Sequence, residues 1–535
     1  MNRRHLLARL LLWPLFLLLA LLLAALMLPM TEAGSLWLLH QAADLARPYG
    51  FDIRFDRGRG TLLGRLQLDG VTFAGADMRV EAGQLLLHWR PVALLDRRLH
   101  VVALEAADVH VVPPPATDAP ASVPQIPDIV LPMTVRLDRL RLDRLSVQQG
   151  EHALQVEHLA LVARLDGDGL VVGDLDFRGQ GIGIGGDLKM QSMSPHDIVG
   201  ALSLAVDAAL TGPDIGAVGG RLALRGTALR PYIDLVLSAP ARVQLQGELR
   251  LDQLQPGFDL TADWPALGWP LRGSPQVVAD EGHLNVQGTA QDYRLIFRSK
   301  VSGDGIPVAD VDLVGTGNLD GLKLAPLQLG LLDGRLRVGG TIGWSGGVSW
   351  DVDVHAERIN PGLYQSDWPG QLSGRVAVSG SLGADGEDLA PQARISEFGG
   401  QLRGYPVQAG GVIDLTDGNV AAEGLAVSSG PNRVRVDGRA GATFDLRFDI
   451  EAPDLASLYP GLTGALAGSG RLEGTPQVPL LVASLDGRSV AFEAMRAGDL
   501  KLDVDWAENG GKGALRIRGL VAPGVEMEKI LLNLS

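Results

Sequence analysis

A serine motif near the middle of the chain is the feature that most resembles a catalytic site. Gly343-Trp-Ser345-Gly-Gly347 fits the glycine-x-serine-x-glycine pattern of a nucleophile elbow. Such an elbow presents its serine where a strand turns sharply into a helix. Here Val348 opens a run of alternating apolar and polar residues, which predicts a strand. We therefore expect a tight turn around Ser345.

Three further motifs resemble ligand-binding loops but lose the pattern that binding needs. Residues 181–186 and 315–321 are glycine-rich like phosphate-binding loops, yet a strand pattern follows each of them, and no helix does. Asp166-Gly-Asp168 starts like a calcium loop, but the apolar Leu170 and its neighbours replace the later ligands. None of the three is therefore expected to bind a phosphate or a calcium ion.

The remaining residue types exclude several functional classes. The absence of cysteine excludes thiol catalysis, disulfides and cysteine-ligated metals. The ten histidines are scattered, without a His-Glu-x-x-His motif. The formal net charge is −15, whereas binding to nucleic acid needs a positively charged surface. The sequence thus predicts no enzyme, no catalytic or metal-binding residue, no cofactor and no nucleic-acid partner.

The elements behind these motifs are expected to be strands with one apolar and one charged face. Alternation with period two recurs along the chain from residue 51 onward. The 69 glycines and 31 prolines fit many turns between strands. The clearest runs place on the apolar face Val348, Trp350, Val352, Val354, Phe444, Leu446, Phe448, Ile450, Leu500, Leu502, Val504 and Trp506. The predicted fold is all-β, with on the order of 40–60 strands at roughly 8–12 residues each.

The N-terminus is expected to be a membrane anchor. Arg3, Arg4 and Arg9 precede residues 10–31, which carry no charge. An uncharged run of this length reaches roughly 33 Å as a helix, enough to cross a bilayer core. It is longer than a signal-peptide core and lacks a small-residue cleavage site, so we expect it to be retained. The arginines should stay cytoplasmic, with the bulk of the chain in the periplasm of a cell with two membranes.

Four regions follow from these patterns. Residues 1–31 are the anchor, and residues 32–112 hold a juxtamembrane helix over 35–49 and a first β unit. Residues 113–132 form a proline-rich linker, and residues 133–535 form a long repetitive sheet. The sequence ends within an expected strand, so we interpret it as the N-terminal part of a longer, truncated sheet.

The second half contains an internal repeat of roughly 90–100 residues. Its ordered matches pair 335–340 with 433–438, 361–364 with 456–459, 372–380 with 466–474 and 409–415 with 497–503. A solenoid-like sheet that grows by adding units fits this pattern.

The apolar face of so long a sheet must be hidden from water. Either the sheet closes on a dry packed core, or it curls into a trough that accepts acyl chains. The inward residues are mostly Leu, Val and Ala, which fill a wide space poorly. The residues leave both readings open, and under the second the twelve apolar residues named above line a lipid groove.

The N-terminal region resembles the TamB family, the inner-membrane subunit of the translocation and assembly module, within the wider AsmA-like group. The likeness covers about the first 115 residues, and the remainder is similar in texture only. It is carried by residues 31–39 directly after the anchor, by 60–73, by 87–95 and by 99–109 with the proline stretch that follows.

The resemblance implies an inner-membrane-anchored periplasmic bridge with a hydrophobic β groove. It implies a protein that is not an enzyme. It further implies phospholipid transport toward the outer membrane, support of outer-membrane protein assembly and protein secretion, or both. The partners implied are phospholipids and a TamA-like outer-membrane barrel, the latter through a C-terminal region beyond this sequence. Two alternatives are a scaffold that templates β-barrel proteins without conducting lipid, and an extracellular β-helix of the passenger or adhesin kind.

Overall fold

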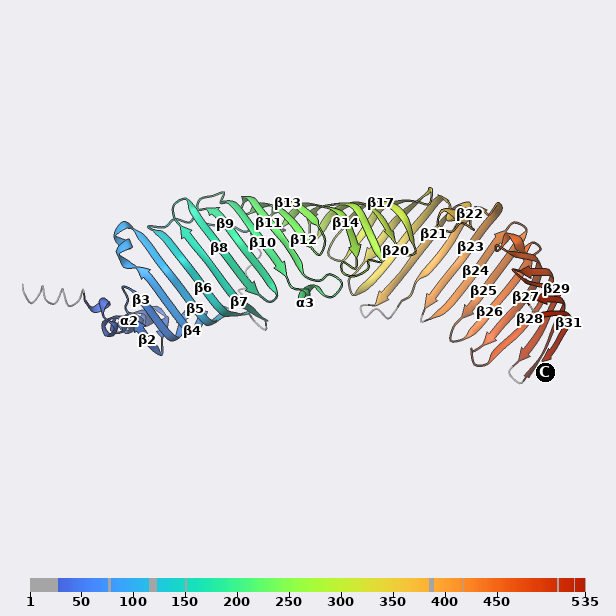
Figure 1. Ribbon diagram of the computed structural model, residues 1–535, viewed down its shortest axis with the longest axis horizontal. Helices are drawn as coiled ribbons and strands as arrows, with labels where there is room; N and C mark the ends of the chain where they lie inside the picture. Colours follow the sequence, from blue (N-terminus) through green and yellow to red (C-terminus); the bar gives the residue numbers. More distant parts are fainter. Residues whose placement is uncertain are drawn as a thin grey trace, which may run out of the picture. The chain divides into compact units, whose positions relative to one another are not determined.

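The protein folds almost entirely into β-strands, as the alternating sequence predicts (Figure 1). The structure, a computed structural model, describes residues 27–75, 78–114, 123–149, 152–383, 389–416, 418–507, 510–523 and 525–534. The described residues form 31 strands, fewer than the 40–60 expected, because single strands run to as many as 16 residues.

The predicted anchor can be compared with the structure only at its end. Arg3, Arg4, Arg9 and residues 10–26 lie outside the described part of the chain. Among the residues that are described, no helix combines the length and hydropathy needed to cross a bilayer.

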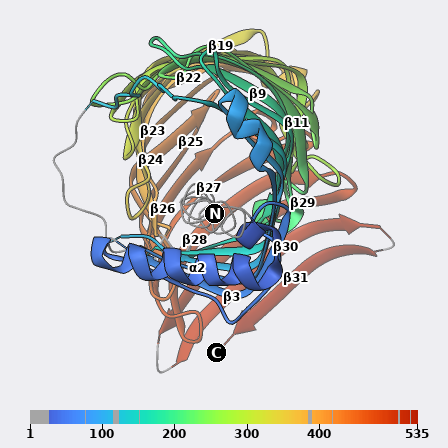
Figure 2. The ribbon, with the colours of Figure 1, turned by 90° about the vertical axis from the view of Figure 1, so that its left-hand side faces the viewer.

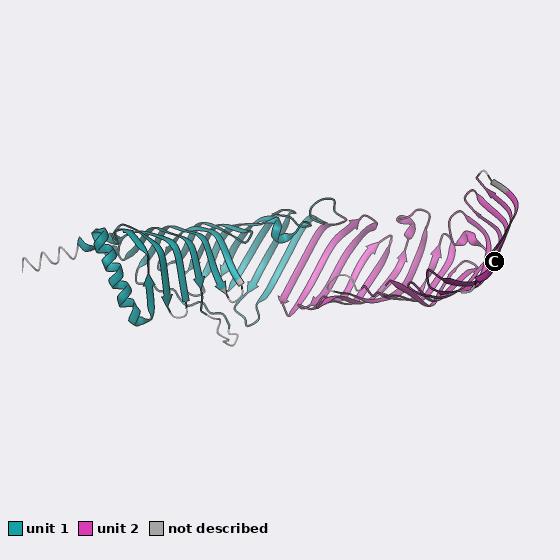
Figure 3. Ribbon diagram, turned by 90° about the horizontal axis from the view of Figure 1, so that it is seen from below, with its two compact units in different colours: residues 1–275 teal, residues 276–535 magenta. Residues whose placement is uncertain are grey.

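The chain divides into two units, residues 1–275 and 276–535 (Figure 3). The domain boundaries predicted near residues 31, 112 and 132 stay predictions, since the single boundary between the two units lies elsewhere, at residues 275 and 276.

Unit 1 begins with short helices and continues as a sheet. The helical segments are η1 Leu28–Met30, α2 Glu32–Ala46, η2 Arg47–Tyr49, η3 Pro91–Asp96 and α3 Ala208–Thr211. The strands are β1 Phe51–Arg54, β2 Arg57–Gly60, β3 Arg65–Gly75, β4 Met78–Arg90, β5 Arg98–Val112, β6 Thr134–Gln149, β7 His152–Leu165, β8 Gly169–Gly179, β9 Ile182–Gln191, β10 Asp197–Val206, β11 Val218–Thr227, β12 Arg230–Ala239, β13 Val243–Arg250 and β14 Gly257–Trp269.

The helix expected over residues 35–49 is confirmed as α2 and η2. It starts three residues early because the Thr31 side chain caps it, accepting a hydrogen bond from the Gly34 amide. β1 and β2 both pair with β3, and α2 packs against them. This arrangement covers the first edge of the sheet, which would otherwise expose unpaired backbone groups.

From β3 to β14 each strand pairs with the next one in the chain. The pairings are antiparallel with one exception, since β5 and β6 run parallel. A parallel pair needs a long connection that returns the chain to its starting end. The proline-rich stretch provides it. Its described part is held to the β9–β10 turn, where the Ile129 amide donates to the Ser192 carbonyl at 2.9 Å.

Unit 2 is a single run of antiparallel strands with two short 3₁₀ turns. The strands are β15 Val277–Thr289, β16 Asp292–Gly303, β17 Ile306–Gly317, β18 Gly321–Leu331, β19 Gly334–Gly343, β20 Gly347–Ile359, β21 Gly370–Gly383, β22 Gln392–Leu402, β23 Tyr405–Thr416, β24 Asn419–Ser429, β25 Asn432–Ala440, β26 Phe444–Ala452, β27 Leu462–Gly474, β28 Pro479–Phe492, β29 Met495–Ala507, β30 Gly510–Ala522 and β31 Val525–Leu534. The turns are η4 Pro361–Leu363 and η5 Leu455–Ser457.

The internal repeat has a structural counterpart in unit 2. The matched segments lie on β19 and β25, on η4 and η5, on β21 and β27, and on β23 and β29. One copy therefore runs from β19 to β24 and the next from β25 to β30. The two copies also touch at the turns, because the rings of Trp368 and Tyr459 lie 5.9 Å apart.

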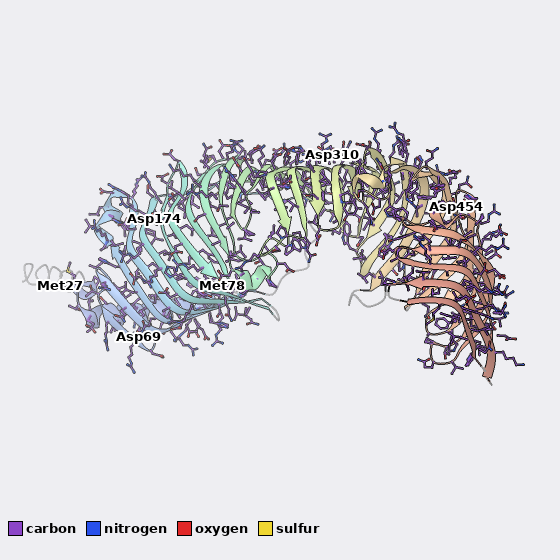
Figure 4. The ribbon with its side chains drawn as sticks, turned by 45° about the vertical axis from the view of Figure 1, so that its right-hand side comes forward. Met27, Asp69, Met78, Asp174, Asp310 and Asp454 are labelled. Atoms are coloured by element: carbon purple, nitrogen blue, oxygen red, sulfur yellow. The ribbon has the colours of Figure 1, made fainter. Side chains whose placement is uncertain are left out.

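A buried polar network holds η5 against the neighbouring strands. Asn432 is only 1% exposed, and its side chain donates to the Asp454 carbonyl at 2.6 Å and accepts from the Asp454 amide at 3.0 Å. The Ser457 hydroxyl donates to the Ser429 carbonyl at 2.8 Å. Asp454, labelled in Figure 4, thus lies where β24, β25 and the β26–β27 connection meet.

Removing the Asn432 amide should loosen this corner. In Asn432→Ala we expect a local destabilisation of about 2 kcal/mol, since buried backbone groups of Asp454 lose their partners. Hydrogen exchange of β25–β27 amides should then speed up about 30-fold. The exposed Asn533 provides the control, and equal exchange in Asn432→Ala and Asn533→Ala would contradict the assignment.

Candidate functional site

A continuous apolar row crosses unit 2. Residues directly opposite each other on paired strands share one face of a sheet. Following the pairing from β15 to β30 gives one residue per strand, and every one is apolar or glycine. This unit 2 row consists of Val286, Leu295, Gly315, Leu324, Gly340, Val352, Val378, Ala393, Ile413, Ala422, Gly438, Leu446, Leu472, Leu481, Trp506 and Gly511.

Unit 1 carries a row of the same kind from β3 to β13. Its members are Leu68, Leu85, Ala106, Leu142, Leu159, Phe177, Ile184, Leu204, Gly220, Leu237 and Val243. The parallel β5–β6 pair does not interrupt it, because Ala106 and Leu142 are still partners. Each unit therefore presents an unbroken apolar face.

The twelve residues predicted for the groove all lie on this face of unit 2. Val352, Leu446 and Trp506 belong to the unit 2 row itself. The other nine lie on the same strands at alternating positions, which places them on the same face: Val348, Trp350, Val354, Phe444, Phe448, Ile450, Leu500, Leu502 and Val504. Strands far apart in the sequence, β20, β26 and β29, thus contribute to one surface. That this surface binds lipid stays a prediction.

This face is only partly covered. Among the non-glycine members of the unit 2 row, Leu324 alone is buried, and Trp506 is 37% exposed. The accessible surface of the chain is 33,282 Å², whereas a compact protein of 56.6 kDa exposes about 19,000 Å². Most non-glycine residues of the unit 2 row are therefore half-buried, and whether the face closes on a core or forms a trough stays a prediction.

Aromatic rings cover glycines on the apolar face. Trp350 is paired with Gly380, and Phe448 with Gly470. A side chain added at Gly380 would meet the Trp350 ring, and one added at Gly470 would meet the Phe448 ring. The rings therefore lie along the sheet over the glycines, an arrangement that stabilises strand pairing at glycine positions.

The opposite face is charged, and the β25–β26 pair sets opposite charges against each other. Arg435 is paired with Asp449, and Asp437 with Arg447. In unit 1, hydrogen bonds from His158 at 2.7 Å and from Arg141 at 2.8 Å lower the pKa of Asp143 below its usual value. Opposite charges facing each other across strands favour this register over one shifted by a residue.

The motifs that resembled sites of chemistry lie in turns between strands or within a strand. The Ser345 hydroxyl donates to Asp320 at 2.6 Å in the β19–β20 turn, and Asp166 accepts from the Asp168 amide at 3.0 Å in the β7–β8 turn. Gly181 ends the β8–β9 turn and residues 182–186 already belong to β9, whereas residues 315–321 span the turn between β17 and β18. Within the described ranges, no cluster of three or more His, Asp or Glu side chains could hold a metal ion.

Sequence reasoning missed the apolar face of unit 1 as part of the candidate site. Leu142, Leu159 and Phe177 alternate with polar residues in the same way as the chosen segments of unit 2. The period-two signal was therefore sufficient, but without strand pairings nothing joined these residues into one row.

Strands that pair in chain order, with one charged and one apolar face, define a class of β-proteins built from a single many-stranded sheet. Within that class, a family model described as "TamB, N-terminal domain" matches residues 19–184 and 201–535. The chain belongs to the TamB N-terminal domain family.

A curated relative agrees with this assignment. The translocation and assembly module subunit TamB of Haemophilus influenzae is 24% identical over 267 residues, which cover 46% of this chain and 20% of that relative. The chain thus matches about a fifth of the length of the relative. No solved structure matches the chain.

Proposed function

We propose that this chain is an inner-membrane-anchored bridge of the translocation and assembly module, without enzymatic activity, that carries phospholipid through the periplasm toward the outer membrane. In this proposal the sheet curls into a trough, and acyl chains travel along its apolar face. The headgroups stay in water beyond the rims.

The observation that carries the proposal is the unbroken unit 2 row. A lipid tail moving along it meets Val352, Leu446 and Trp506 in turn without crossing a polar side chain. Each methylene group removed from water contributes about 0.8 kcal/mol, so a tail of ordinary length is held firmly at any point. Because no polar side chain interrupts the row, movement from one strand to the next exposes the tail to no polar group.

Membership of the TamB family supports the partners and the location. The relative in Haemophilus influenzae is by its name a subunit of the translocation and assembly module. We therefore propose a TamA-like outer-membrane barrel as the protein partner. The anchor formed by residues 1–31 would hold the N-terminus in the inner membrane, with the sheet in the periplasm.

Photocrosslinking in cells tests the proposal. A benzoylphenylalanine placed at Phe448 or at Val504 should form adducts with phospholipid, because both positions lie on the apolar face. The same probe at Val482, which alternates with the apolar positions of β28 and is 56% exposed, should form none. If the probes form adducts with outer-membrane barrel proteins and none with lipid, the chain is an assembly scaffold and the lipid-transport proposal is wrong.

A further inference from the structure

The first end of unit 1 carries exposed apolar side chains that the sheet does not use. On α2, Ser35 and Ala43 are buried toward β1, β2 and the β2–β3 turn. Trp37, Leu45 and Tyr49 on α2 and η2 are 53%, 71% and 81% exposed. The helix therefore has a second, unpartnered apolar side.

The connection between β4 and β5 adds a second patch at the same end of unit 1. In η3, Val92 and Leu95 are 73% and 85% exposed. Figure 2 shows α2 running across one side of this end of unit 1, with η3 on the opposite side of the same end. The exposed Arg90 and Arg97 flank η3 and supply positive charge beside the apolar residues.

The sequence before α2 indicates what covers these patches. Residues 10–31 form the expected membrane anchor, and α2 begins at Glu32, directly after it. A helix that starts where a membrane span ends must lie at or near the bilayer surface. Exposed Trp, Tyr and Leu side chains with basic neighbours match the composition of that interfacial layer.

The junction between anchor and sheet is built to be stiff. The Ser35 hydroxyl donates to the Pro29 carbonyl at 3.0 Å and accepts from the Leu62 amide at 2.9 Å. The Leu62 carbonyl in turn accepts from the Trp89 ring at 2.6 Å. Ser35 is fully buried, so these bonds are shielded from water. Pro29 is therefore linked to β4 through three successive hydrogen bonds.

We propose that α2–η2 and η3 form a membrane seat, which rests the first end of unit 1 on the phospholipid bilayer surface. Trp37, Leu45, Tyr49, Val92 and Leu95 enter the interfacial layer, and Arg90 and Arg97 meet anionic headgroups. On the inner side of α2, Leu36 lies beside Gly58 and Leu68, the first residue of the unit 1 row. The seat thus holds the start of that row next to the membrane.

Single-cysteine labelling tests the seat on the full chain, which has no native cysteine to replace. An environment-sensitive nitrobenzoxadiazole dye is attached to Leu45→Cys, Leu95→Cys or the control Val199→Cys on β10, which is 62% exposed in the same unit. Each protein is placed in nanodiscs of phosphatidylethanolamine and phosphatidylglycerol. We expect doxyl groups near the lipid headgroups to quench the dyes at 45 and 95 at least about twofold more than at 199.

Three outcomes overturn the proposal. Equal quenching at all three positions by aqueous iodide, with none by doxyl lipid, shows that the first end stands off the bilayer. Protection at 45 and 95 that appears only in native membranes assigns these patches to a protein partner. A chain that fails to stay with the nanodiscs removes the anchor on which the seat depends. The lipid-conduit proposal is independent, because the crosslinks at Phe448 and Val504 report on unit 2.

Discussion

Replacing Val352 and Val504 together by aspartate should reduce phospholipid transfer between vesicles at least about tenfold. Both valines are half-buried on the apolar face, in β20 and β29. A carboxylate there must either lose its water when a lipid tail passes or keep the tail away. Loss of as little as 1.4 kcal/mol per step already costs a factor of ten, and desolvating a charge costs more. Transfer from donor to acceptor vesicles and phospholipid bound per chain, by mass spectrometry, are the two measurements.

A matched pair of substitutions separates a damaged surface from a damaged fold. Val308 and Val482 lie on β17 and β28 of the same unit and are 59% and 56% exposed. Both alternate with apolar-face residues, so their side chains are on the charged face. The double variant Val308→Asp/Val482→Asp should keep its lipid and its rate of transfer. If it loses both to the same extent as Val352→Asp/Val504→Asp, the apolar face has no special role.

The sequence was sufficient to predict the apolar face of unit 2, because strands alternate with a fixed period. Once Val348 to Val354, Phe444 to Ile450 and Leu500 to Trp506 are strands, the side of each residue follows from its parity. The relation between the three segments also follows, since antiparallel neighbours in chain order pair along the sheet. The structure adds the register, which aligns Val352, Leu446 and Trp506 in one row.

Features that depend on contacts between distant residues could not be predicted in this way. The parallel β5–β6 pair arises because the proline-rich connection returns along the sheet, and its path depends on contacts such as Ile129 with Ser192. The network around Asn432 joins residues more than 20 positions apart. Local periodicity carries no information about either. The number of strands was overestimated for a related reason, because strand length is set by the width of the sheet as a whole.

The glycines of the unit 2 row give the second large effect. Gly340 has a φ of +140°, and a side chain there would run into the carbonyl oxygen of Asp351 on the paired strand. Gly438, its counterpart in the next copy of the repeat, has a φ of +115° and meets Asp445 in the same way. We expect Gly340→Ala to destabilise the β19–β20 pairing by about 3 kcal/mol, the sum of backbone strain and overlap. Hydrogen exchange of the β19 and β20 amides should speed up by about 150-fold.

Gly339 is the control, since it precedes Gly340 in β19 and an added side chain would find nothing within 4 Å. Gly339→Ala should leave exchange within about threefold of the parent protein, or slow it slightly by restricting the unfolded chain. Similar acceleration in both variants would mean that the strand tolerates no added side chain at all, and that the conformation of Gly340 is not the cause. A large effect confined to Gly340→Ala would show that the glycine is needed because the backbones of β19 and β20 approach closely at this position. Because Val352 is paired with Gly340, that approach keeps the unit 2 row in register, and a slip by one residue would turn its side chains to the charged face.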